Sequence, residues 1–138
     1  MREHQVTPVA FFRLSGSERG AHRLPKVRII RRKGDFQRVY HSGRSYANRY
    51  LVLYVSRESG DGGKVGFAAG KKLGGAAVRN RIKRILRESY RLHQGSLDPG
   101  CAILLVGRKA LVGARRQVAE EAFLQLCRRA GILSGEPG

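Results

Sequence analysis

"AAVRNRIKRILRESYR" at residues 76–91 decides the fold, because it places an amphipathic helix in the middle of the chain. Its apolar residues recur at the i, i+3, i+4 spacing of one helix face, and they are Val78, Ile82, Ile85 and Leu86. At 100° per residue they share a sector about 100° wide. The sequence therefore predicts a helix from about Ala76 to His93 that packs this face on a sheet.

Six cations and a single acid, Glu88, occupy the same stretch. Arg79, Lys83 and Arg87 form a row at i, i+4, where each like-charged pair costs about 0.2–0.5 kcal/mol. A solvated surface is the ordinary interpretation of a charged helix, but such surfaces usually mix signs. A phosphate backbone would stabilise the row, since each neutralised phosphate releases counterions. The residues expected to meet an anionic partner are Lys71, Lys72, Arg79, Asn80, Arg81, Lys83, Arg84, Arg87 and Arg91.

The composition supports a polyanionic partner. The 138 residues suggest one domain, and 28 Lys and Arg against 10 Asp and Glu give a net charge of +18. Nucleic acid and an anionic membrane both fit this charge. The longest apolar stretch, "CAILLVG" at 101–107, is far shorter than the roughly 20 residues of a spanning helix. The N-terminus has no secretion signal, so we expect a cytoplasmic protein that does not bind membranes.

The segments around the basic helix predict an α+β fold. Helices are expected at 34–43, with Asp35 as its cap, and at 115–131, while strands are expected at 44–47, 49–56, 64–70 and 101–108. The order helix, strands, helix, strand, helix is typical of a two-layer sandwich with helices packed on a small sheet. We predict a flexible extension at 1–22, an RNA-binding domain at 23–131 and a disordered tail at 132–138.

No catalytic or metal-binding residue is predicted. Glu120 and Glu121 are adjacent on a helix and point about 100° apart, so they cannot share a metal or a proton. Cys101 and Cys127 lack C-x-x-C spacing and are expected to be packed thiols. The four histidines have no metal-ligand spacing, and they are His4, His22, His41 and His93.

Aromatic residues near the basic helix indicate the kind of nucleic acid. Unpaired bases stack on aromatic rings at about 1–3 kcal/mol each. The candidates are Phe36, Tyr40, Tyr54 and Phe67, although any of them could belong to the core instead. Tyr40 and Tyr54 are the better ligand candidates, because a phenol tolerates a wet edge. From the residues alone, the chain is interpreted as a binder of single-stranded or phosphate-rich RNA.

The stretch "RNRIKRILRESYR" (79–91) resembles the signature of the bacterial ribonuclease P protein family. The neighbouring stretches "RIIRRKGDFQRVYHSGRSYANRYLVLYV" (28–55) and "KVGFAAGKKLGGAAVRNRIKR" (64–84) resemble the same family, so the similarity extends over residues 24–130. The family usually has Ser where Gly70 stands and Val where Ala77 stands. Gly70 removes a hydroxyl contact, and neither change affects the basic face.

The resemblance implies a noncatalytic protein subunit of ribonuclease P, which removes the 5′ leader of precursor tRNA. The active site and its Mg²⁺ ions are expected on the RNA subunit, and the protein itself is expected to bind no cofactor. Its implied partners are ribonuclease P RNA and precursor tRNA, not DNA. The nine residues of the basic set would face RNA, and the four aromatic residues would line a cleft for the leader. The family fold, which is like that of ribosomal proteins, has a left-handed βαβ crossover.

Three alternatives remain at this point. The first is a ribosomal or other general single-stranded-RNA-binding protein on a similar sandwich. The second is a metal-dependent nuclease that cleaves without an RNA subunit, for which the sequence offers no ligand set. The third is a protein that binds membrane surfaces.

Overall fold

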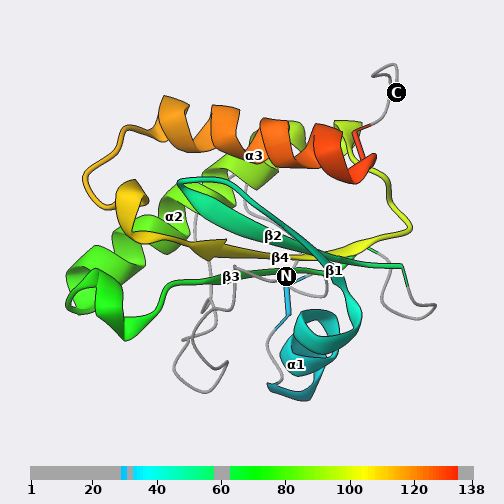
Figure 1. Ribbon diagram of the computed structural model, residues 1–138, viewed down its shortest axis with the longest axis horizontal. Coiled ribbons are helices and arrows are strands. Elements are labelled where there is room, and N and C mark those ends of the chain that lie inside the picture. Colours follow the sequence, from blue (N-terminus) through cyan, green and yellow to red (C-terminus); the bar gives the residue numbers. More distant parts are fainter. Residues whose placement is uncertain (1–28, 31–32, 58–62, 134–138) are drawn as a thin grey trace.

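A computed structural model describes residues 29–30, 33–57 and 63–133, and its main elements confirm the predicted α+β fold (Figure 1). The helices are α1 (Lys33–Ser42), α2 (Ala76–His93) and α3 (Arg116–Ala130), and the strands are β1 (Arg44–Ala47), β2 (Leu51–Ser56), β3 (Val65–Ala68) and β4 (Ala102–Gly107). Short 3-10 turns are η3 (Lys71–Leu73), η4 (Gln94–Ser96) and η5 (Lys109–Leu111).

The four strands form one sheet in the order β1-β2-β4-β3. β1 pairs with β2, and β2 with β4, in antiparallel orientation. β3 and β4 are parallel neighbours, so α2 is the crossover between them. Every residue of β4 is buried, as expected for a continuous apolar strand inside a sheet.

Alternate residues of β2 point into two separate hydrophobic clusters. Leu51, Leu53 and Val55 face the cluster formed with α2 and α3, and Val52 and Tyr54 face the cluster formed with α1. This alternation follows from the two-residue period of a strand. Figure 1 shows α2 and α3 on one face of the sheet and α1 on the other.

The basic helix lies very close to the central strand. A Cβ added at Gly107 of β4 would come within 2.6 Å of Cγ2 of Ile82, which is fully buried on α2. A side chain at position 107 therefore cannot be accommodated unless α2 moves. The hydrogen atom of this glycine allows the apolar face of α2 to pack against β4.

Two predicted boundaries are corrected by the structure. Asp35 does not cap α1, because the helix begins at Lys33 and the Asp35 carboxylate accepts a hydrogen bond from Arg38 within the first turns. Ile132 belongs to the packed chain, since it is 2% exposed and its carbonyl accepts a hydrogen bond from the Asp98 amide. The proposed extension at 1–22 and residues 134–138 of the proposed tail lie outside the described residues.

No helix within the described segments combines the length and the apolar character that crossing a membrane requires.

Candidate nucleic-acid interface

A glycine-rich turn places two lysines directly before the basic helix. Gly74 has a φ of 142°, a conformation that residues with a side chain rarely adopt. A Cβ there would also approach Val78 to within 3.1 Å. Lys71 and Lys72 are exposed on η3, which precedes this turn. The turn thus extends the cationic surface of α2 beyond its N-terminus.

The outward face of α2 carries only part of the predicted "RNR" motif, because consecutive helix residues point about 100° apart. Asn80, Arg81 and Arg84 are exposed, and Arg79 is half-buried. Arg81 donates a hydrogen bond of 3.0 Å to the Ala114 carbonyl, which directs its side chain toward the loop before α3. Nε of Arg79 donates a hydrogen bond of 3.4 Å to the Gly75 carbonyl. Asn80, Arg81 and Arg84 therefore share the outward surface, whereas Arg79 lies about 20° from the buried Leu86 and Tyr90, toward the packed side of the helix.

Acidic residues do not neutralise this surface. Within the described part of the chain, no ion pair involves Lys71, Lys72, Arg79, Arg81 or Arg84. Glu88, the one acid on α2, accepts two hydrogen bonds from Arg91, at 2.5 and 3.2 Å. Arg91 is therefore already paired with Glu88. The five other cations have no acid partner among the described residues, and an external anion can meet them.

The structure contradicts the expectation that Lys83 projects into solvent, because its side chain is 5% exposed. Arg87, one turn further, has its guanidinium 5.8 Å from the centroid of the Phe67 ring. The buried sector of α2 is wider than its aliphatic residues indicated. Tyr90 is buried too, 6.0 Å from Phe67 and 6.5 Å from Phe123, measured between ring centroids. Lys83 therefore lies on the side of α2 that packs rather than on the outward face.

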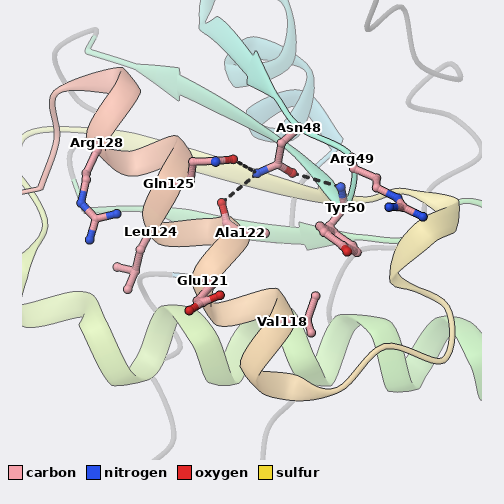
Figure 2. A pocket seen from close by; sticks show the side chains of 9 residues that line it. All are labelled: Asn48, Arg49, Tyr50, Val118, Glu121, Ala122, Leu124, Gln125 and Arg128. Carbon is pink, nitrogen blue, oxygen red and sulfur yellow. Dashed lines mark hydrogen bonds between the residues drawn. The ribbon is translucent and has the colours of Figure 1, made fainter.

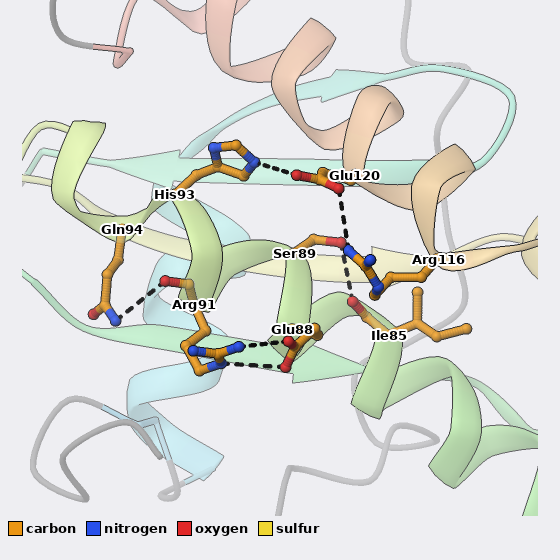
Figure 3. A network of polar contacts seen from close by, with 8 residues as sticks. All are labelled: Ile85, Glu88, Ser89, Arg91, His93, Gln94, Arg116 and Glu120. Atoms are coloured by element: carbon orange, nitrogen blue, oxygen red, sulfur yellow. Dashed lines mark hydrogen bonds and ion pairs between the residues drawn. The ribbon is translucent and has the colours of Figure 1, made fainter. Parts of the chain in front are cut away.

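A polar network fixes the C-terminal half of α2 to α3 (Figure 3). Nε2 of His93 lies 2.6 Å from Oε2 of Glu120, and Oε1 of the same carboxylate accepts a hydrogen bond of 3.2 Å from Arg116. All three groups are partly exposed. Glu120 thus joins the end of α2 to the first turn of α3, and this contact helps to orient the outward face of α2.

The four aromatic candidates do not line one cleft, and the prediction is wrong for Phe67. Phe67 is fully buried with α2 and α3, whereas Phe36, Tyr40 and Tyr54 belong to the cluster on the opposite face of the sheet. The reason is its position on β3, where successive side chains alternate between the two faces. Phe36 is also fully buried, so its ring is part of the core.

Tyr40 and Tyr54 form a pair beside α1. Their ring centroids lie 5.0 Å apart with the planes tilted by 42°. Burial raises the pKa of Tyr54, and the neighbouring Tyr40 hydroxyl adds to the rise. Tyr54 is 4% exposed, whereas Tyr40 is half-buried. Tyr40 is therefore the aromatic of this face that a base could reach.

Sequence reasoning missed a second set of cations on the opposite edge of the sheet. They are exposed, and they are Arg44, Arg49, Arg108, Arg128 and Arg129. They come from three distant segments, so no motif connects them. The stretch "RSYANRY" (44–50), where arginines alternate with tyrosines, was the one local signal.

Among the residues that the structure describes, no group of three or more His, Cys, Asp or Glu side chains could hold a metal ion.

Comparison with known proteins identifies the family. Residues 24–131 match the family model described as Ribonuclease P. The chain belongs to the ribonuclease P protein family. A protein of this family is part of an endoribonuclease of tRNA processing, and ribonuclease P RNA is its partner.

Individual relatives agree with this assignment. The ribonuclease P protein component of Clostridium acetobutylicum is 38% identical over 110 residues, which cover 78% of this chain and 92% of the relative. The solved ribonuclease P protein of Staphylococcus aureus has a TM-score of 0.70 at 28% identity, over 78% of this chain and 98% of that one. The Thermotoga maritima ribonuclease P protein has a TM-score of 0.62 at 29% identity, over 78% of this chain and 96% of that one.

Proposed function

We propose that the outward face of α2, together with Lys71 and Lys72, is the surface that binds ribonuclease P RNA. The observation that carries this proposal is a set of five cations that have no acid partner among the described residues, three of them on α2, which packs on the sheet, and two on the preceding η3. Cations at such positions gain from phosphate contacts because counterions are released into solution. A protein with a net charge of +18 also attracts RNA over distances beyond direct contact.

We further propose that the protein assists cleavage and does not catalyse it, with the active site and its Mg²⁺ ions on the RNA subunit. The family resemblance supports this division. Four of the five described acids also favour it, because Asp35, Glu88, Asp98 and Glu120 are each engaged by an arginine. The protein would screen repulsion between two RNAs, so its effect should be largest at low salt or low magnesium. Such a partner of ribonuclease P RNA would act in the cytoplasm.

The α1 face of the sheet is proposed to contact the 5′ leader of precursor tRNA. Tyr40 supports this role, because its ring lies between those of Tyr54 and His41, at 5.0 and 5.1 Å between centroids, and is only half-buried. A stacked base contributes about 1–3 kcal/mol. Phe36 and Tyr54 would support this ring from the core rather than meet the leader directly.

The RNA-binding proposal is tested with two charge-matched variants. Arg81→Gln/Arg84→Gln removes two exposed cations from α2, and Lys33→Gln/Lys64→Gln removes two cations that lie on α1 and before β3. Affinity for ribonuclease P RNA is measured over a range of salt concentrations. The slope of log affinity against log salt should fall by about 2 for the α2 pair, since each lost phosphate contact removes about one unit. Equal slopes for the two variants would show that α2 is not the RNA-binding surface.

Assistance in cleavage is tested by reconstitution. The purified protein is added to ribonuclease P RNA at low magnesium, and release of the 5′ leader from precursor tRNA is followed. Restored cleavage is expected, and cleavage by the protein without RNA would identify a nuclease instead. Binding of RNA without restored cleavage would favour a general RNA-binding protein.

The leader contact is tested separately. Tyr40→Ala should weaken binding of precursor tRNA to the reconstituted complex by roughly 5- to 100-fold, the equivalent of one lost stacking contact. Binding of mature tRNA, which has no leader, should stay unchanged. Equal losses for the two RNAs would exclude a role of Tyr40 in contacting the leader.

A further inference from the structure

A groove lies between α3 and the segment 48–50 (Figure 2). It encloses about 710 Å³ and follows α3 from Val118 to Arg128. On the same face of the sheet, α3 packs on β1 and β2 toward one edge, whereas α2 packs on β3 and β4 toward the other edge. This feature, named here the α3–β1 groove, is therefore distinct from the outward face of α2.

The side of the α3–β1 groove formed by segment 48–50 is held in place by one amide side chain. Nδ2 of Asn48 donates hydrogen bonds to the Ala122 carbonyl at 3.0 Å and to Oε1 of Gln125 at 2.8 Å. Its Oδ1 accepts hydrogen bonds from the amides of Tyr50 and Leu51, at 3.0 and 3.1 Å. The segment and α3 are thus fixed relative to each other, as Figure 2 shows, and the groove is formed before a ligand binds.

Arginines converge on this segment from three parts of the chain. Arg108 donates a hydrogen bond of 2.9 Å to the Asn48 carbonyl, and Arg129 donates one of 2.9 Å to the Ala47 carbonyl. The guanidinium of Arg49 lies 5.6 Å from the centroid of the Tyr50 ring. Arg128 lines the groove from α3, where the one acid among the lining residues is Glu121. Cations therefore outnumber acids in and around the groove.

A second, smaller hollow continues along the end of α3. It encloses about 200 Å³ and is bordered by Arg44, Tyr46 and Ala130, among others. Each of the two hollows has an arginine beside a tyrosine. Arg44 and Tyr46 border the smaller hollow, and Arg49 lies over the Tyr50 ring at the α3–β1 groove. Alternating cations and aromatic rings are the features with which proteins hold single-stranded nucleic acid, by contacting its phosphates and stacking its bases.

We propose that the α3–β1 groove binds a single-stranded segment of RNA, as a second contact in addition to the outward face of α2. This inference rests on the proposed function as an RNA-binding subunit and adds a site to it. A second copy of the chain fits the groove poorly, because each copy carries a net charge of +18 and like-charged surfaces repel. An RNA strand has the opposite charge and exposes the bases that the tyrosines can stack on.

The first test extends the salt titration with ribonuclease P RNA to a third charge-matched variant, Arg49→Gln/Arg128→Gln. Both arginines are exposed, and circular dichroism verifies that the variant folds. The slope should fall by about 1.4, since a single strand contributes about 0.7 per phosphate contact. A slope equal to that of Lys33→Gln/Lys64→Gln would overturn the groove proposal. An unchanged slope for Arg81→Gln/Arg84→Gln alone would refute the α2 proposal and leave the groove standing.

The second test locates the contact by cross-linking. Cys101 and Cys127 are both buried, so a cysteine introduced by Glu121→Cys is the residue that a thiol-reactive photo-cross-linker labels in the folded protein. Illumination should join position 121 to ribonuclease P RNA, and Arg49→Gln/Arg128→Gln in the same background should abolish this product. Cross-links between two protein chains, or none to RNA, would overturn the proposal.

Discussion

Replacing Gly107 by alanine should weaken the attachment of the basic helix to the sheet. The added Cβ would lie 2.6 Å from Cγ2 of Ile82, whereas carbon atoms in contact prefer about 3.5–4.0 Å. Both residues are buried, and β4 is enclosed by neighbouring strands and by helices on both faces. α2 would therefore have to move outward by about 1 Å.

Overpacking of this kind costs about 1–3 kcal/mol. For a domain of this size, the melting temperature falls by roughly 4–8 °C per kcal/mol, so a loss of roughly 5–20 °C is expected. Calorimetry or circular dichroism measures it. Gly34→Ala is the matched control, because its Cβ would have no neighbour within 4 Å. That change should be neutral or stabilise the protein by up to about 1 kcal/mol.

A second substitution tests the cause directly. Ile82→Leu moves the branch point away from Cβ and so removes the Cγ2 atom that the new methyl group would meet. The double variant Gly107→Ala/Ile82→Leu should be more stable than the sum of the single changes by about 0.5–3 kcal/mol. Additive changes, or a Gly107→Ala protein that melts like the wild type, would refute the close approach of α2 to β4.

Three further outcomes are expected. Asn48→Ala should lower the urea midpoint by the equivalent of about 1–3 kcal/mol, because it leaves buried backbone groups without their partner; an unchanged midpoint would contradict this. The Gly100 amide, more than any other group, lowers the pKa of Asp98. Because Asp98 is so exposed, its ionised carboxylate should stabilise the folded protein by less than about 1 kcal/mol. This stabilisation should be present above pH ~4 and disappear as the pH falls through the folded-state pKa of Asp98. If the wild type still melted at a higher temperature than Asp98→Ala at pH 2, by as much as at neutral pH, this pH dependence would be contradicted. Burial raises the pKa of Cys127 to about 12 and also raises the pKa of Cys101. Thiol reagents at pH 8 should therefore react with these cysteines only as the protein unfolds. Rapid labelling of the native state would exclude such burial.

The sequence predicted the elements well because their signals are local. The range of α2 follows from its apolar spacing, and β1 and the central β4 follow from their composition. Gly131 ends α3 in the left-handed conformation, which glycine adopts readily and which commonly ends a helix. Asp35 was misassigned because Asp is favoured both at the cap and in the first turn of a helix, and the local sequence does not distinguish these positions.

The surface of α2 was predicted less well, since a helical wheel gives angles and not neighbours. Lys83 shares its angular position with Tyr90, and the packing of Tyr90 against Phe67 buries that side of the helix. Phe67 itself was assigned to the wrong face, because β3 is four residues long and its glycine and alanine give no clear alternation. The arginines of the α3–β1 groove could not be grouped at all, since only the fold brings residues 44–49, 108 and 128–129 together.

A helix with the cationic row of α2 is unfavourable in isolation, so its stability has to come from tertiary contacts. Three of them act at different points along the helix: the close packing of Ile82 on Gly107, the hydrogen bond from Arg81 to the loop before α3, and the contact of His93 with Glu120. These contacts fix the direction of the helix, and its exposed cations Arg81 and Arg84 have no acid partner among the described residues. Repulsion among these cations and the neighbouring Lys71 and Lys72 is what an RNA phosphate backbone would relieve. RNA should therefore stabilise the folded protein, and preferentially so at low salt.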